Sequence, residues 1–143
     1  MKLGIRALRY ISAALVGDYS YLAPGSTFNL SGFLSGALST LPFTPETGDI
    51  SEKWQYDDNG KYSDFLFSSS IRADRETYRP VLQQLEGQKA IFEIETTDGR
   101  KYVIGSKEFI PTFTFSDSVS GQSTSQFSIT ISLKSLHGAL FSV

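Results

Sequence analysis

Two glutamates in the second half of the chain have the spacing that comes nearest to acid–base chemistry. Glu93 and Glu95 alternate with apolar residues, so in a strand both carboxylates would lie on one face, about 7 Å apart. Paired carboxylates catalyse hydrolysis only when they converge in a cleft that shifts their pKa values. The pattern supplies no such cleft. We therefore interpret the pair as a solvated strand face, with Lys101 as a partner across a hairpin.

The remaining candidates for chemistry are an acidic turn and a single histidine. The run Asp57–Gly60 begins like a calcium-binding loop, but that loop closes with a glutamate, and Ser68 occupies the corresponding position. Its Asn-Gly pair favours a tight hairpin turn instead. Because His137 is the only imidazole and cysteine is absent, a multi-histidine or thiolate metal site is excluded. We predict no catalytic residue, no metal site and no cofactor, and we place His137 at the surface or at a strand end.

Sequence periodicity indicates which elements carry these residues. From Gln126 to Leu133, apolar and hydroxyl side chains alternate strictly, which predicts a strand with one buried face. The opposite face holds Ser128, Thr130 and Ser132, and we expect it to be solvated. This pattern is typical of a sheet with one face on the core and the other in water.

One helix is expected, at about residues 75–86. A buried stripe with helical spacing is formed by Tyr78, Val81, Leu82 and Leu85. Together with the strands, this predicts a mainly β fold: an antiparallel sandwich or a rolled barrel with one α-helix packed against it.

Turn signals divide the other strands. Asp57–Gly60 and Thr97–Gly99 each predict a hairpin turn. A further strand is expected at Phe109–Phe115, with Pro111 at an edge or at the strand's start because proline cannot donate to a ladder. Residues 116–125 are polar and contain a glycine, so we expect a loop there.

The N-terminal stretch has two interpretations. Basic residues precede an apolar run at 10–16, as in a signal peptide, but the run is short and charges reach into it. We favour an ordinary strand or helix, whose buried side would hold Ile5, Leu8, Ile11 and Leu15.

The stretch 23–49 is rich in Gly, Pro, Ser and Thr, which predicts a long loop or arm. It also carries apolar side chains, so it lacks the composition of a disordered linker. Loops of this length in a compact domain are usually functional, and exposed apolar groups are costly unless covered. We therefore expect an assembly loop that docks on a neighbouring molecule through Phe28, Leu30, Phe33, Leu34, Leu38, Leu41 and Phe43.

Composition predicts a single β-rich domain over residues 1–143, long enough to bury a core. The formal net charge is −2 and the basic residues are scattered, so we expect neither nucleic acid nor a membrane as a partner. No apolar run reaches the about 18 residues of a membrane-spanning helix. Charged residues make up 20% of the chain, below the typical value of about 25%, which suits a chain that buries surface in an assembly.

Aromatic residues offer a second kind of site. Trp54, Tyr56 and Tyr62 flank the acidic turn and could stack on a sugar or another apolar ligand. A carbohydrate- or ligand-binding β module is therefore the alternative to an assembly protein.

From residue 54 onward, several short segments follow one another in a distinctive order. They are Trp54, Asp57–Tyr62, Phe65–Phe67, Arg75, Val81–Leu85, Ala90–Ile94, Asp98–Ser106, Phe113–Phe115, Phe127–Thr130 and Ala139–Phe141. In this order and spacing the sequence resembles the tail-associated, minor structural virion proteins of tailed phages and prophages.

The resemblance implies a role in assembly and no catalytic residues. A protein of this kind would associate with itself, as in a ring, and with other tail proteins. It would be found in the virion, or in the host cytoplasm during assembly, and secretion is not expected.

Overall fold

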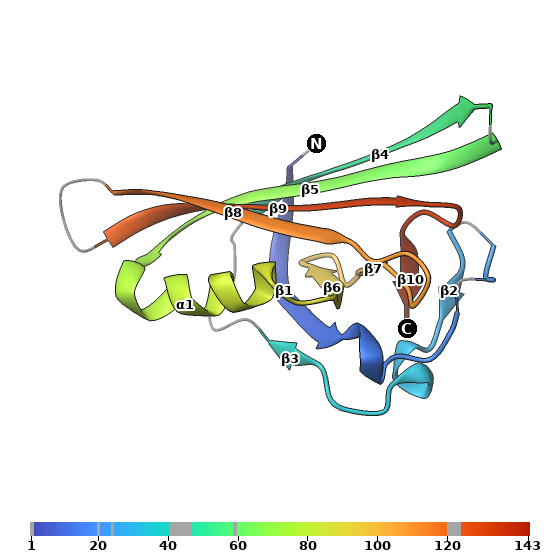
Figure 1. The fold of residues 1–143 in the computed structure, drawn as a ribbon, viewed down its shortest axis with the longest axis horizontal. Coiled ribbons are helices and arrows are strands. Elements are labelled where there is room, and N and C mark those ends of the chain that lie inside the picture. Colours follow the sequence, from blue (N-terminus) through green and yellow to red (C-terminus); the bar gives the residue numbers. More distant parts are fainter. Residues whose placement is uncertain (1, 20, 24, 41–46, 59, 120–123) are drawn as a thin grey trace.

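The structure is a computed structural model that describes residues 2–19, 21–23, 25–40, 47–58, 60–119 and 124–143 (Figure 1). The strands within these residues are β1 (Lys2–Ser12), β2 (Thr27–Phe28), β3 (Ser39–Thr40), β4 (Thr47–Asp57), β5 (Gly60–Asp74), β6 (Ala90–Thr96), β7 (Lys101–Ile104), β8 (Thr112–Val119), β9 (Thr124–Ser135) and β10 (Leu140–Ser142). The helices are the 3-10 turns η1 (Ala13–Leu15) and η2 (Leu30–Phe33) and the α-helix α1 (Arg75–Glu86).

The strands form two sheets that face each other. β4, β5, β9 and β8 lie in that order in a four-stranded sheet that is antiparallel throughout. The others form a six-stranded sheet, which is mixed because β2 runs parallel to β10. β1 connects the two, since Lys2–Gly4 pair with β4 and the residues from Ile5 to Ser12 pair with β6. The sheets do not close, so the predicted β-sandwich is confirmed and the barrel is not.

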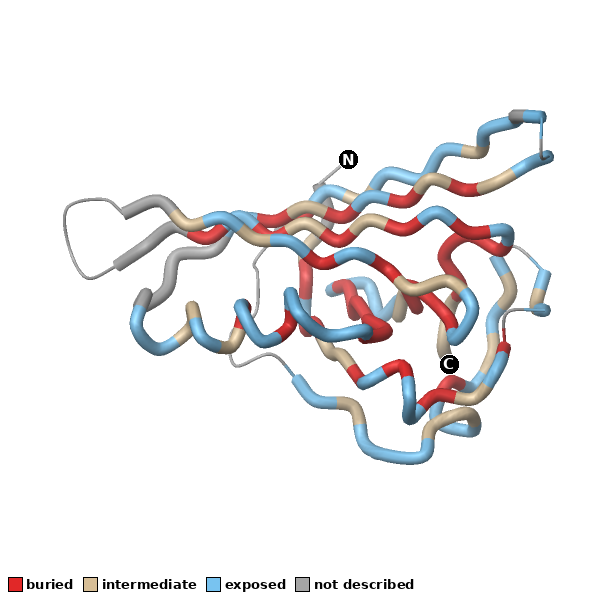
Figure 2. The backbone as a smooth tube through the Cα atoms, in the orientation of Figure 1, coloured by how far each residue is buried: buried red, intermediate tan, exposed pale blue. Residues whose placement is uncertain are grey.

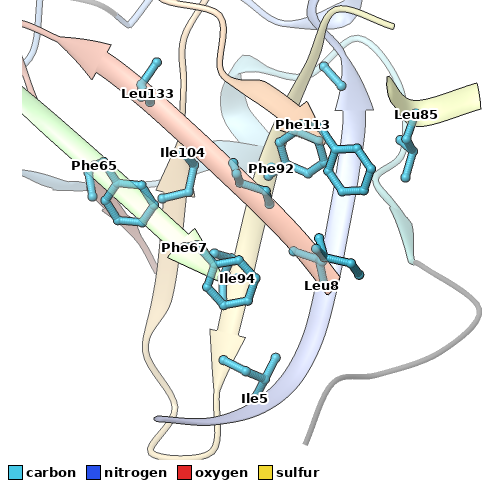
Figure 3. Packing of buried hydrophobic residues seen from close by; sticks show 14 of the residues in the cluster. Ile5, Leu8, Phe65, Phe67, Leu85, Phe92, Ile94, Ile104, Phe113 and Leu133 are labelled. Carbon is cyan, nitrogen blue, oxygen red and sulfur yellow. The ribbon is translucent and has the colours of Figure 1, made fainter. Parts of the chain in front are cut away.

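The main core lies between the two sheets and α1 (Figures 1 and 3). Phe65 and Phe67 of β5 point into it and are buried. Phe92 of β6 stacks on Phe113 of β8 with ring centroids 5.6 Å apart, so the sheets touch through aromatic rings. Burying each side chain of this size contributes about 1.5–3 kcal/mol, so this contact helps to hold the two sheets together.

The alternating strand is present as predicted. On β9 the buried side chains are Phe127, Ile129, Ile131 and Leu133. The intervening hydroxyl residues lie on the outer face, where Ser128 is exposed and Thr130 and Ser132 are half-buried. A period of two thus turns one side of β9 to the core and the other to water.

The helix α1 spans Arg75–Glu86, as expected. Leu82 and Leu85 are buried, and Tyr78 and Val81 lie against the same core. The stripe holds the helix beside β8 and β5 on the inner face of the four-stranded sheet (Figure 1).

Much of the predicted loop 23–49 is part of a strap, by which we mean residues 13–19, 21–23 and 25–40. Apart from β2 and β3, which pair with β10 and β1 at the edges of the six-stranded sheet, the strap covers the face of that sheet that points away from the main core. Tyr19 and Leu30 of the strap are buried with Ile11, Ile91 and other residues of the sheet in a second core. Leu15 was expected on a buried side, but it is 42% exposed because the chain leaves β1 at Ser12 and turns through η1.

The strand expected at Phe109–Phe115 begins and ends later, as β8. Phe109 lies in a turn, where its carbonyl accepts a hydrogen bond from the Ser106 N–H at 2.8 Å, and the ladder starts after Pro111. The predicted polar loop 116–125 is also shorter, because β8 runs on to Val119 in register with β9. Cross-strand pairing decides the conformation of these small polar residues, and their composition alone does not reveal it.

Candidate functional site

The glutamates of β6 are not solvated, which corrects the interpretation of that strand. Glu93 is 4% exposed and Glu95 is 8% exposed. Arg9 on the neighbouring β1 donates from Nη1 to Glu93 Oε1 at 2.8 Å and to Glu95 Oε1 at 2.9 Å. Lys101 lies opposite Glu95 across the hairpin, as expected, and Arg6 Nε is 3.5 Å from a Glu95 oxygen.

The charges around Glu95 do not prepare it to act as a general acid. The hydrogen bond from Arg9, with the positive charges of Arg6 and Lys101 nearby, lowers the pKa of Glu95. A general acid needs a pKa near the working pH, so a carboxylate held in its ionised form is a poor proton donor. What the arrangement does is neutralise buried charge and tie β1 to β6.

His137 is 1% exposed, so of its two predicted positions the surface is wrong, and the residue lies just beyond the end of β9. It lies in the corner between β9 and β10, where Nδ1 is 2.6 Å from the Gly138 carbonyl and Nε2 is 3.1 Å from Ser106 Oγ. With its hydrogen on Nδ1, the neutral ring donates to Gly138 and accepts from the Ser106 hydroxyl. These two bonds make burial possible, and burial lowers the pKa of His137. Because Ser106 is itself fully buried, the pair holds a corner and does not face a substrate.

The three aromatic residues of the alternative ligand site do not share one face. Trp54 and Tyr56 lie on one face of the β4–β5 hairpin, whereas Tyr62 lies on the other and donates to Gln55 Oε1 at 3.0 Å. Lys61 Nζ is 4.9 Å from the ring centroid of Trp54 and 5.8 Å from that of Tyr56. The two rings thus already contact a cation of their own hairpin. Any ligand platform here consists of two rings and a lysine, and its use remains a prediction.

The residues of the predicted assembly loop are covered within the chain where the structure describes them. Leu30 is buried, and the partly buried members are Phe28, Phe33, Leu34 and Leu38. The rings of Phe28 and Phe33 lie 4.8 and 5.6 Å from the ring of Tyr19, whose hydroxyl donates to the Gly105 carbonyl at 2.8 Å. Leu41 and Phe43 fall outside the described residues. The described members are covered within the chain, so they do not need a partner molecule to bury them. A docking role for this set stays a prediction.

Both edges of the four-stranded sheet lack a partner strand within the described residues. β4 pairs with β1 only through Thr47–Asp49, so Ile50–Asp57 has β5 on one side and no strand on the other. β8 is the outermost strand on the opposite side. An edge strand directs a row of unpaired N–H and C=O groups outward, where another chain can pair with them. The sequence is compatible with Pro111 at an edge or at the start of a strand, and it gives no sign of the edge on β4.

The outer face of this sheet is rich in hydroxyl groups. They belong to Ser51, Ser68, Ser70, Thr112, Thr114, Ser116, Ser128, Thr130 and Ser132. Leu66 is 43% exposed on the same face, and Asp49 borders a shallow polar hollow there. Hydroxyl groups bind water readily, so this face is better suited to solvent than to a dry interface.

Arg9→Met should lower the free energy of unfolding by about 3–5 kcal/mol, because Glu93 would be left buried without its partner and Glu95 would lose its hydrogen bond from Arg9. Urea unfolding at pH 7, followed by circular dichroism, measures the change. Arg100→Met is the matched control, since Arg100 and its partner Asp98 have side chains that are 65% and 60% exposed. Adding Glu93→Gln and Glu95→Gln to Arg9→Met should recover part of the loss. Equal losses for the Arg9 and Arg100 variants would contradict the assignment.

The stability of the protein should also depend on pH through His137. Burial lowers the pKa of the folded histidine, so as the pH falls through about 6.5 the unfolded chain takes up a proton first. The free energy of unfolding should therefore be highest above this pH and fall between about pH 7 and pH 5. Because His137 is the only histidine, His137→Gln should flatten this slope in a series of urea titrations. An unchanged slope in the variant would refute the assignment.

Within the described residues, no group of three or more acidic, histidine or cysteine side chains could hold a metal, and no helix is long and apolar enough to cross a membrane. No protein-family model, curated protein or solved structure matches this chain. The basis for a function is therefore the geometry of the described residues: buried charges that have partners, an outer face rich in hydroxyl groups, and two strands, β8 and Ile50–Asp57 of β4, with no described strand on their outer side.

Proposed function

We propose that this protein is a structural subunit of the phage- or prophage-tail type, which acts by self-assembly or by docking to other tail proteins and not by catalysis. The observation that carries the proposal is the four-stranded sheet. It is covered on one face and exposed on the other, and among the described residues no strand pairs with the outer side of β8 or with the outer side of Ile50–Asp57 of β4. Strand addition to such edges is a common way for chains to bind one another. The protein would act in the virion, or in the host cytoplasm during assembly.

The β4–β5 hairpin supports the same role. It extends beyond the body of the sandwich (Figure 1), and most of the described residues near its turn are exposed (Figure 2). Tyr56 is 77% exposed close to this end. Aromatic residues are enriched at protein interfaces because they bury much area at little entropic cost, so the projecting hairpin is a suitable contact for a neighbour.

The groups that could do chemistry have structural partners, which also favours assembly. Glu93 and Glu95 are bound by Arg9, and His137 is bound by Ser106 and Gly138. An active site needs such groups to be accessible and to have pKa values matched to a reaction.

A carbohydrate-binding module is the second candidate, and the exposure of the Tyr56 ring favours it. Trp54 is the only tryptophan of the chain, so its fluorescence would report a sugar that stacks on this face. A monomer with saturable fluorescence changes on adding oligosaccharides would support this candidate over assembly.

Self-assembly should appear as a dependence of molar mass on concentration. Size-exclusion chromatography with light scattering should give the 15.8 kDa chain at low concentration and larger species as the concentration rises. Because the contact joins strand edges and not opposite charges, the larger species should persist when the salt concentration is raised. A chain that stays monomeric up to about millimolar concentration, the Kd of an association worth only about −4 kcal/mol, would contradict the proposal.

A further inference from the structure

The edge of β8 is occupied by side chains of α1. The N–H of Phe115 donates to Glu86 Oε2 at 3.4 Å, and Arg79 Nε lies 3.8 Å from the Asp117 carboxylate. Because the Phe115 N–H points at Glu86, it points away from β9. Glu86 therefore takes up a backbone donor that a neighbouring strand would otherwise use.

The edge of β4 has no such cover. In the described part of the chain, no hydrogen bond joins the backbone of Ile50–Asp57 to any element other than β5. Its register with β5 is continuous, without a bulge that would turn the edge away. The two edges of one sheet thus differ: β8 is capped by a carboxylate, and β4 is open.

The two edges match in direction and length. Directions alternate from β4 through β5 and β9 to β8, so β4 and β8 run opposite ways. In a second copy in the same orientation, β4 would lie antiparallel beside β8 of the first, and each face of the sheet would continue. β8 has 8 residues, and the unpaired part of β4, Ile50–Asp57, has the same length. In the register that places Ser116 opposite Lys53, Asp117 lies opposite Glu52, and Arg79, 3.8 Å from the Asp117 carboxylate, offsets the repulsion between these two charges.

The edges are also displaced along the sheet. One row of paired residues crosses Ile50, Phe67, Ile131 and Phe113. From this row β4 continues toward the hairpin turn, whereas β8 continues the other way. Such a stagger is what tilted strands in a curved or closed sheet require. A contact between two different edges is heterologous, and its repetition gives a ring or a filament.

We propose that β8 of one copy of this chain pairs antiparallel with Ile50–Asp57 of a second copy, and that Glu86 caps the β8 edge until that strand replaces it. The inference rests on the proposed function and names the partner and the interface. Glu86 would then set the concentration at which assembly begins, because it competes with the partner strand for the Phe115 N–H.

Cysteine cross-linking tests the pairing, since the natural chain has no cysteine. Lys53 on β4 and Ser116 on β8 are exposed and lie on the outer face, where a short bis-maleimide spans opposite or diagonal neighbours about 5–8 Å apart. Lys53→Cys with Ser116→Cys should give a ladder of covalent oligomers. The control, Lys53→Cys with Gln83→Cys on an exposed position of α1, should not.

The role of Glu86 has its own test by light scattering. Glu86→Ala should lower the concentration at which half the chains are assembled, by about threefold to tenfold. Glu76→Ala removes the same charge from the other end of the helix and should leave that concentration unchanged. An equal effect of both variants, or none, would overturn the capping role.

The outcomes separate this inference from the proposed function. Assembly without a ladder, or a cross-linked dimer of Lys53→Cys alone, would mean that another surface is used and would overturn only the β8–β4 pairing. If neither the natural chain nor Glu86→Ala assembles at any concentration, self-assembly fails as well.

Discussion

The four-stranded sheet has one apolar face, and burying that face is the constraint from which the rest of the structure follows. Phe65, Phe67 and the inward residues of β9 need a cover, which the six-stranded sheet and α1 supply. The Phe92–Phe113 stack lies in this contact. β1 makes the arrangement possible because it belongs to both sheets. With one face covered and the pairing of β1 with β4 ending at Asp49, the outer face and the edge of Ile50–Asp57 remain open within the described residues, and side chains of α1 cap the edge of β8.

The buried polar groups also stabilise this arrangement. Burying the charge of Glu93 or Glu95 alone would cost several kcal/mol, and Arg9 offsets this by reaching both carboxylates from the neighbouring strand. His137 is buried in neutral form because each ring nitrogen has a partner. These interactions fix the contact of β1 with β6 and the corner between β9 and β10. The groups with reactive chemistry thus stabilise the scaffold, and the free hydrogen-bonding capacity lies at the sheet edges.

The sequence predicted local elements well and long-range partners poorly. Residues close together in the sequence determine both the stripe from Tyr78 to Leu85 and the alternation of β9. The helix and the strand were therefore predicted with their correct buried faces. The burial of Glu93 depends on Arg9, 84 positions away along the chain, and on a strap that local composition predicts as a loop. The one available signal was a lone arginine in the largely apolar stretch 7–11. The burial of His137 was missed for the same reason, because its partner Ser106 lies 31 positions away along the chain.

Pairing between the two different edges of the four-stranded sheet would protect their backbone amides, because paired amides exchange slowly. Backbone hydrogen exchange, measured by mass spectrometry at increasing protein concentration, detects this protection. We expect amides in Ile50–Asp57 and Thr112–Val119 to gain protection together, while those of β6, already paired on both sides, do not change. Protection that grows in the strap instead, or in only one of the two edges, would contradict the pairing.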